Sequence, residues 1–307
     1  MPQNRRDFLS LCSAASLQLQ PPPRIDPLTR TGSGRARNRL SAATALALEE
    51  AEQNPYWLDA LERIDAKPPR RRSAAVHRST LVRGDTSRPW VALTFDDGPH
   101  PNSTRQILDV LHDFRAPATF FVVGEMAHRY PELIREQSRG GHSIGNHTYH
   151  HVSLSKIPRR YIATEIKACG EVVASVIGRA PRLFRPPGGD YDTEVAELAV
   201  GLGYRMVLWT SDPGDYRSPG PAVILKRIEA GLSPGAVILV HDGIRQTLEV
   251  LPELILMIRR RGLQLVTIDQ MLEAPPAPTL KTQEPGPLGA TPPHGRESLR
   301  PLERPPR

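Results

Sequence analysis

Residues 90–99 read Trp-Val-Ala-Leu-Thr-Phe-Asp-Asp-Gly-Pro, and this stretch organises the interpretation of the whole chain. Its first four residues form an apolar run that is typical of a buried strand, and the final Gly-Pro ends that strand. Asp96 and Asp97 therefore lie at the carboxyl end of a core strand, where α/β folds carry their functional residues. Two carboxylates this close repel each other, so we expect a cation or an arginine beside them.

From residue 90 onward, short apolar runs alternate with amphipathic segments. Strands are expected at 90–96, 118–123, 142–146, 183–186, 205–211, 236–241 and 264–268. Helices are expected between them at 103–114, 131–139, 159–177, 193–201, 220–231 and 246–261. Most of the strand segments contain a short continuous apolar run, as in Ala236-Val237-Ile238-Leu239-Val240, which indicates strands buried on both faces, as in a parallel sheet. Seven strands with intervening helices predict an α/β fold, either a compact barrel or a doubly wound sheet.

The segments on either side of this region differ from it in composition. Ten of the 32 prolines fall in 274–307, which predicts a disordered, Pro-rich tail. The apolar spacing over 41–64 predicts a helix capped by Ser41 and interrupted at Pro55. The chain thus divides into 1–40 (export signal and linker), 41–88 (helical segment and linker), 89–273 (the main folded domain) and 274–307 (the tail).

The net charge of +7 arises outside the main domain. Residues 89–273 contain 20 Lys+Arg and 21 Asp+Glu, a net charge of −1, so the sequence gives no support for a nucleic-acid-binding core. Two cysteines are too few for a disulfide framework, and we expect no disulfide. No run of 18 apolar residues is present, so no transmembrane span is expected.

The first residues contain Asn4-Arg5-Arg6-Asp7-Phe8-Leu9-Ser10, which resembles a twin-arginine export signal. The apolar segment after it is short and interrupted, and no clear cleavage site follows. A functional signal would place the protein in the periplasm or cell envelope; without one, the protein would remain in the cytoplasm.

Histidines follow the third expected strand in the sequence His147-Thr148-Tyr149-His150-His151. One helical turn would place His147 and His151 on the same side, because they are four residues apart. With a carboxylate, for which Asp97 is the nearest candidate, they would form a two-histidine, one-carboxylate metal site. His150 could replace His151 if the turn is not helical. His142, inside the strand, is interpreted as structural.

Polar residues also follow the next three strands. Arg185 precedes Pro186-Pro187-Gly188-Gly189, where the prolines stiffen the loop and the glycines allow a close approach of backbone N–H groups to a reacting oxygen. The fifth strand ends at Asp212-Pro213-Gly214-Asp215-Tyr216 and the sixth at His241-Asp242-Gly243. A histidine at a buried strand end with a carboxylate beside it is suited to general acid catalysis.

Five segments together resemble the ordered motifs of the polysaccharide deacetylases, carbohydrate esterase family four. They are TFDDGP at 94–99, NHTYHH at 146–151, RPPGG at 185–189, DPGDY at 212–216 and LVHDG at 239–243. The resemblance spans about 90–272. It implies a distorted (β/α) barrel, here with seven strands, and a divalent-metal enzyme that acts on acetylated sugars. Residues 89–273 would then be the catalytic domain.

The resemblance also implies residue roles. Asp97, His147 and His151 would be the metal ligands, Asp96 the general base and Arg185 the residue that orients Asp96. His241 would be the general acid, with Asp215 as its partner. Pro187, Gly188, Tyr216 and Leu239 would contact the substrate, Tyr216 and Leu239 as walls of the acetyl pocket.

This chain departs from the family pattern at two positions. Gly188 stands where the family usually has tyrosine, which removes a ring from the substrate surface but keeps the backbone N–H. Tyr216 stands where the family usually has tryptophan, which keeps an apolar wall and adds a hydroxyl group.

The resemblance implies hydrolysis of an N-acetyl or O-acetyl group of a polysaccharide, such as peptidoglycan or chitin-like oligomers, by metal-activated water. Zinc is the first choice of metal for a site with two nitrogens and one oxygen, and cobalt, manganese and iron would also fit. Three alternatives stay open: a metal-dependent amidohydrolase acting on a non-sugar amide, a non-catalytic carbohydrate-binding protein, and a structural protein whose barrel has lost its activity. The motifs do not distinguish the polymer or the oligomeric state.

Overall fold

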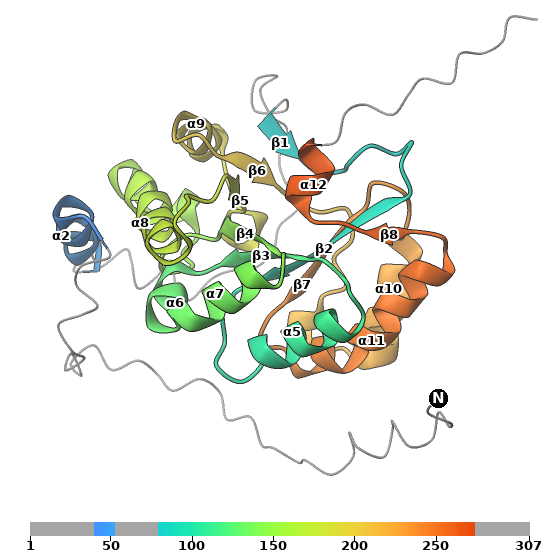
Figure 1. Cartoon of the computed structure of the whole chain (residues 1–307). Helices are drawn as coiled ribbons and strands as arrows, with labels where there is room; N and C mark the ends of the chain where they lie inside the picture. The colour runs from blue at the N-terminus through green and yellow to red at the C-terminus, as the bar shows by residue number, and fades with distance from the viewer. Residues whose placement is uncertain (1–39, 53–78, 274–307) are drawn as a thin grey trace, which may run out of the picture.

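The computed structural model describes residues 40–52 and 79–273 (Figure 1). The expectations of an export signal, of the later part of the 41–64 helix and of a disordered Pro-rich tail concern residues outside these ranges.

Eight parallel strands form one curled sheet in the described part of the chain. The strands are β1 (Thr80–Leu81), β2 (Trp90–Asp96), β3 (Thr119–Val122), β4 (Ser143–Asn146), β5 (Leu183–Phe184), β6 (Arg205–Val207), β7 (Val237–His241) and β8 (Gln264–Leu265). Their order is β1-β6-β5-β4-β3-β2-β7, and β8 pairs with β2. The expected α/β fold with a parallel sheet is confirmed, but the expected number of seven strands is wrong, because β1 is a two-residue strand too short to produce an apolar pattern.

Helices lie around the sheet and connect successive strands (Figure 1). The α-helices are α2 (Ala42–Glu52), α5 (Thr104–Asp113), α6 (Gly124–Arg129), α7 (Pro131–Arg139), α8 (Arg159–Ile177), α9 (Thr193–Gly201), α10 (Pro221–Gly231), α11 (Arg245–Arg260) and α12 (Ile268–Glu273). Three short 3₁₀ turns are η2 (Leu154–Lys156), η3 (Pro187–Gly189) and η4 (Asp215–Arg217). Six helices match the expected ranges to within about a residue, whereas α6 and α12, each six residues long, were not expected.

The central strand is β2, which pairs with β3, β7 and β8. Five of its seven residues are apolar, and all except Trp90 are buried, as a strand covered on both faces requires. Leu93 and Phe95 are 0% and 1% exposed, and each contributes about 1.5–3 kcal/mol from burial of its side chain. The position of Asp96 and Asp97 is therefore fixed by a buried strand that pairs with three others.

The sheet curls far enough for the segment after β6 to contact β7. Ser211 forms a parallel bridge with Ile238, and its carbonyl oxygen accepts a hydrogen bond of 2.9 Å from Leu239 N. These contacts join the two sides of the sheet into the distorted barrel. They also shorten β6, which ends at Val207 and not at the expected residue 211. β5 ends at Phe184 and β8 at Leu265, before the expected ends at 186 and 268.

The N-terminal helix α2 packs against α8 (Figure 1). Ser41 Oγ accepts a 3.1 Å hydrogen bond from Thr44 N, as expected of the helix cap. Thr44 Oγ1 donates to Glu171 of α8 at 2.7 Å, and Leu48 is 4% exposed against the main core. The helical N-terminal extension thus belongs to the packed structure of the barrel. No helix within 40–52 or 79–273 is long and apolar enough to cross a membrane.

Candidate active site

The side chains that follow β2, β4, β5 and β7 lie at the same end of the barrel. Asp96 is the register partner of His241 on the neighbouring strand β7. Asn146 is the partner of Phe184, so His147 and Arg185 follow at adjacent strand ends. Parallel strands present their carboxyl ends at one edge, and the register therefore gathers these residues without any long loop.

Asp97, His147 and His151 form a cluster that could hold a metal ion, with one donor atom from each within 4.8 Å of the others. Asp97 Oδ1 lies 3.0 Å from His151 Nε2 and 3.4 Å from His147 Nε2. This oxygen is buried and makes no hydrogen bond. Buried polar atoms are almost always satisfied, and a cation between the three donors would satisfy this one. The donor set therefore fits a divalent metal.

The charges within this cluster shift its pKa values in opposite directions. Burial would raise the pKa of Asp97, but His151 and His147 beside it hold that pKa well below its usual range. Burial would lower the pKa of His151, but Asp97 raises it. Both shifts describe the protein without metal, since a ligating imidazole must be neutral.

His147 is oriented by the loop that follows β5. Its Nδ1 lies 2.7 Å from the carbonyl oxygen of Arg185 and donates a proton to it, and the side chain is buried. This hydrogen bond fixes the tautomer that leaves Nε2 free to bind a metal.

The segment from His147 to His151 is not a helical turn, contrary to expectation. Thr148 and His151 adopt positive φ angles of 67° and 60°, and Asp97 has a φ angle of 73°. Side chains other than glycine rarely adopt this region, and such strain is concentrated at functional sites. A sharp bend, and not a helix, brings the two imidazole rings to a centroid distance of 5.0 Å.

The other two histidines considered from the sequence lie elsewhere. His150 turns toward α8, where its Nδ1 lies 2.8 Å from Glu165 Oε1, so it is not part of the candidate metal cluster of Asp97, His147 and His151. His142 accepts a hydrogen bond of 3.2 Å from Ala118 N, and burial lowers its pKa to about 4. Each of these two histidines thus joins its strand or loop to a neighbouring segment.

Arg185 is completely buried and holds Asp96 by a 2.6 Å contact from Nη1 to Oδ1. The same guanidinium donates to Thr94 Oγ1 at 2.8 Å and to the carbonyl oxygens of Val207 and Leu208. Burial lowers the pKa of Arg185, and the charge of Asp96 opposes this shift. The second oxygen of Asp96 lies 3.7 Å from His147 Nε2, which places it next to the metal-binding cluster.

His241 forms a comparable pair with Asp215. Its Nδ1 donates to Asp215 Oδ1 at 2.7 Å, while Oδ2 accepts from His241 N at 2.8 Å and from Thr247 Oγ1 at 2.5 Å. Burial would lower the pKa of His241, but the hydrogen bond to Asp215 and the charges of Asp97, Asp215 and Asp96 raise it to about 9. His241 is therefore held protonated at neutral pH.

The four residues expected to contact substrate lie on elements next to these pairs. Pro187 and Gly188 begin η3, and Gly188 has a φ angle of 61°. Leu239 is buried two residues before His241 on β7, so both point to the same face of the sheet. The Tyr216 ring meets that of His241 edge-on at 5.4 Å and is 36% exposed.

Several residues around the site were not found from the sequence. Trp209 lies with its ring 5.5 Å from the Arg185 guanidinium and so close to Gly189 that a Cβ there would approach it to 2.6 Å. Thr94 supports Arg185 from inside β2, and Glu165 contacts the histidine loop from α8. All three lie within expected strands or helices, where polar and aromatic residues give no functional signal. Asp212, considered as a strand-end acid, is exposed and accepts a hydrogen bond from Gly214 N.

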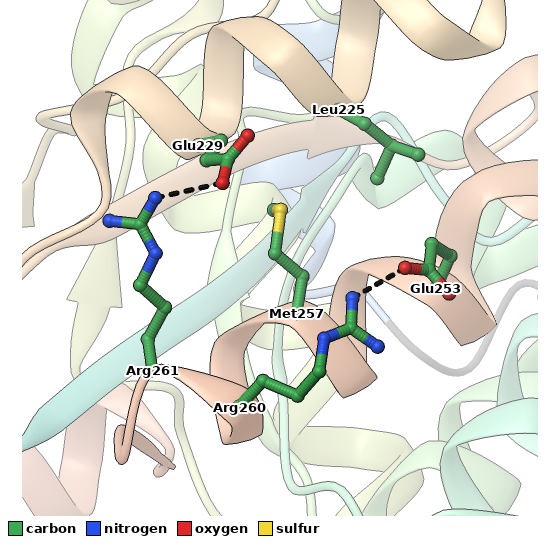
Figure 2. Close-up of a pocket in the computed structure, with 6 residues that line it drawn as sticks. All are labelled: Leu225, Glu229, Glu253, Met257, Arg260 and Arg261. Atoms are coloured by element: carbon green, nitrogen blue, oxygen red, sulfur yellow. Dashed lines mark hydrogen bonds and ion pairs between the residues drawn. The ribbon is translucent and has the colours of Figure 1, made fainter.

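A separate hollow of about 330 Å³ lies between α10 and α11. Figure 2 shows the residues that line it: Leu225, Glu229, Glu253, Met257, Arg260 and Arg261. Its two arginines each pair with a glutamate, at 2.8 Å and 2.5 Å, and the four charged side chains are about half exposed. Exposed ion pairs of this kind contribute little to stability, and none of the expected site residues lines the hollow.

The fold and the site together define a (β/α)-barrel protein with a two-histidine, one-carboxylate cluster and two ion pairs, Arg185–Asp96 and His241–Asp215, at the same end of the barrel. The polysaccharide deacetylase family model matches residues 83–207. A chitooligosaccharide deacetylase of Sinorhizobium fredii is 39% identical over 165 residues, which cover 53% of this chain and 77% of that protein. The chain belongs to the polysaccharide deacetylase family.

Two solved structures are also similar. The Bc1960 peptidoglycan N-acetylglucosamine deacetylase has a TM-score of 0.64 and 29% identity, over 67% of this chain and 99% of the other. The protein BA3943 from Bacillus anthracis is described as a pseudoenzyme of carbohydrate esterase family 4. It has a TM-score of 0.61 and 25% identity, and the match covers 63% of this chain and 69% of that protein. The barrel is therefore shared by a protein named as a deacetylase and by one described as a pseudoenzyme.

Proposed function

We propose that this protein is a metal-dependent deacetylase that hydrolyses N-acetyl or O-acetyl groups of a polysaccharide such as peptidoglycan or a chitin-like oligomer. The observation that carries the proposal is the convergence of Asp97, His147 and His151, whose donor atoms all lie within 4.8 Å of one another. Acetylated sugars are the substrates named for the relatives, and residues 89–273 would be the catalytic domain.

The metal would be held by Asp97 Oδ1 and by the Nε2 atoms of His147 and His151. Two nitrogens and one oxygen suit zinc first, and cobalt, manganese or iron would also fit. A divalent ion there would polarise the acetyl carbonyl group and lower the pKa of water.

Asp96 is the proposed general base. Its Oδ1 is fixed by Arg185, which leaves Oδ2, 3.7 Å from His147 Nε2, to accept a proton from the attacking water. The Arg185 guanidinium also balances the charge of this buried carboxylate at 2.6 Å. The base is thus held in place with one oxygen left available.

His241 is the proposed general acid. Because its Nδ1 is bound to Asp215, Nε2 is the nitrogen that can donate a proton to the leaving amine. The N–H of Gly188 would stabilise the oxyanion of the tetrahedral intermediate. Water addition and proton transfer to the amine together give acetate and a free amino sugar.

A polymer substrate is favoured over a small non-sugar amide by Tyr216. Its ring is partly exposed beside His241, and exposed aromatic surface next to a catalytic group is suited to contact with a sugar ring. The intact pairs Asp96–Arg185 and Asp215–His241 favour catalysis over sugar binding alone, because they place an oriented carboxylate and a histidine with a raised pKa beside the same three-residue cluster.

The test is to incubate the full chain with N-acetylglucosamine oligomers, peptidoglycan and acetylated xylan and to measure released acetate and product mass. Wild-type protein should deacetylate at least one of these, and Asp96→Asn should reduce the rate by about 10²-fold or more. Equal rates for the two proteins would contradict the assignment of Asp96. Turnover of a small amide alone would favour the non-sugar alternative.

A further inference from the structure

Glu165 is a completely buried carboxylate of α8 to which neither the sequence nor the proposed mechanism gives a role. Its Oε2 accepts hydrogen bonds from Tyr149 N at 3.0 Å and His150 N at 2.9 Å. Its Oε1 lies 2.8 Å from His150 Nδ1. A carboxylate taken out of water costs free energy unless it is paired and hydrogen-bonded, and these three bonds all go to one short segment.

That segment lies between the two histidines of the metal-binding cluster. The backbone N–H groups bound by Glu165 belong to the two residues that separate Thr148 from His151, which both have positive φ angles. Thr148 N is held by Asn146 Oδ1 at 2.9 Å on the preceding side. The carbonyl oxygens of Thr148 and Tyr149 accept from the N–H groups of Gly124 and Glu125 at 2.9 Å, and His151 N donates to Thr148 Oγ1 at 3.1 Å. Among these contacts, Glu165 is the buried carboxylate that holds the two residues before His151.

The same carboxylate also holds one of two adjacent histidines away from the cluster. His150 and His151 are adjacent, and either imidazole could reach a metal if the bend were different. Glu165 holds the His150 imidazole against α8, while His151 Nε2 lies 3.0 Å from Asp97 Oδ1. Side-chain contacts that orient ligands in this way commonly change metal affinity by about 10–100-fold when removed.

We propose that Glu165 is a positioning residue for the metal site: it fixes the bend that directs His151 to Asp97 and withholds His150. This inference rests on the proposed function, because it concerns the metal that Asp97, His147 and His151 would hold. Glu165 acts through hydrogen bonds and touches neither metal nor substrate.

The test is a titration of the full-length, metal-stripped protein with Co²⁺, which reports affinity and, through its visible absorption bands, the ligand geometry. Glu165→Ala removes all three bonds. Glu165→Gln keeps an oxygen for the two backbone N–H groups and an amide that can donate to His150. Glu171→Ala is the matched control, because Glu171 lies on the same helix and also bonds to a neighbouring segment, through Ser41 and Thr44.

Glu165→Ala should bind Co²⁺ about 10–100-fold more weakly with an altered spectrum, Glu165→Gln should stay within a few-fold of wild type, and Glu171→Ala should match wild type. Circular dichroism of the metal-free proteins verifies that each variant is folded. Wild-type affinity and spectrum in Glu165→Ala would overturn the inference, as would equal losses in both Glu165 variants. A wild-type chain that binds no divalent metal would instead overturn the proposed function, and the inference with it.

Discussion

The guanidinium of Arg185 and the carboxylate of Asp96 lie 2.6 Å apart, with side-chain exposures of 0% and 4%. Removing one partner of a buried ion pair leaves the other charge unpaired in a poorly solvated site. We therefore expect Arg185→Met to lower the free energy of unfolding by about 3–5 kcal/mol and to reduce deacetylation sharply. Urea unfolding monitored by circular dichroism measures the first effect, and an acetate assay measures the second.

The matched control for this prediction is the exposed pair Arg182–Glu273, which has the same 2.6 Å separation but exposures of 68% and 64%. Arg182→Met should change the free energy of unfolding by no more than about 1 kcal/mol. Equal changes in the free energy of unfolding for Arg185→Met and Arg182→Met would show that the burial of the Arg185–Asp96 pair does not increase the cost of breaking it.

The stability of the folded protein should depend on pH through the pair His241–Asp215. The pKa of His241 is raised from 6.5 to about 9, so the pair stabilises the folded state most fully below pH 6.5 and loses this stabilisation as the pH rises through about 9. Proton NMR of the metal-free protein should give a His241 pKa near 9. A bound cation would lower this value by neutralising Asp97.

The same pair should control catalysis, because only protonated His241 can donate to the leaving amine. The rate should fall at high pH as His241 loses its proton, and Asp215→Asn should move that fall to lower pH by removing the charge and the hydrogen-bond acceptor. An alkaline limb at the same pH in wild type and Asp215→Asn would exclude His241 as the group that titrates.

Metal binding should be lost when a residue of the Asp97, His147 and His151 cluster is replaced, and it should be kept when a histidine outside the cluster is replaced. Asp97→Ala and His147→Ala should each abolish stoichiometric binding of zinc or cobalt, because two remaining donors hold a metal poorly. His142→Ala is the control, since His142 is buried outside the cluster and bonds to Ala118 N. Elemental analysis after dialysis measures the metal content, and full content in both ligand variants would show that the ligands are other residues.

Gly98 is a position where a single methyl group should impair the site. A Cβ there would lie 2.5 Å from Asp242 Oδ2, and Asp242 accepts hydrogen bonds from Ser103 and Thr104. Gly98→Ala should cost about 1–3 kcal/mol of stability and lower the rate, because the displaced loop follows directly after Asp97. Gly201→Ala, where nothing lies within 4 Å, should be neutral or slightly stabilising. Similar thermal unfolding of the two variants would contradict the steric argument.

The sequence predicts the sheet well because its strands are buried on both faces and therefore appear as apolar runs. It misses β1, whose two residues produce no pattern, and α6, whose six residues follow β3 almost directly. It places the end of β5 too late because Arg185 turns inward to hold Asp96, and the end of β6 too late because the segment after Val207 crosses to β7 at Ser211.

Residues of the site could be found where they stand at the end of an expected strand, as Asp96, His147, Arg185 and His241 do. The residues that support them from within a strand or a helix could not be found in this way. Thr94 lies within β2, and Glu165 comes 14 positions after His151 on α8, so only the folded chain brings each to its contact. The bend at Thr148 was also missed, because positive φ angles outside glycine are imposed by surrounding contacts.

The measurement we would make first is acetate release by the full chain from N-acetylglucosamine oligomers and peptidoglycan, before and after chelation and after zinc or cobalt is restored. We expect release that the chelator abolishes and either metal recovers, with no recovery in Asp97→Ala. Release that persists in metal-free protein would contradict a metal-dependent deacetylase. The absence of both release and bound metal would place this chain with the inactive members of its family.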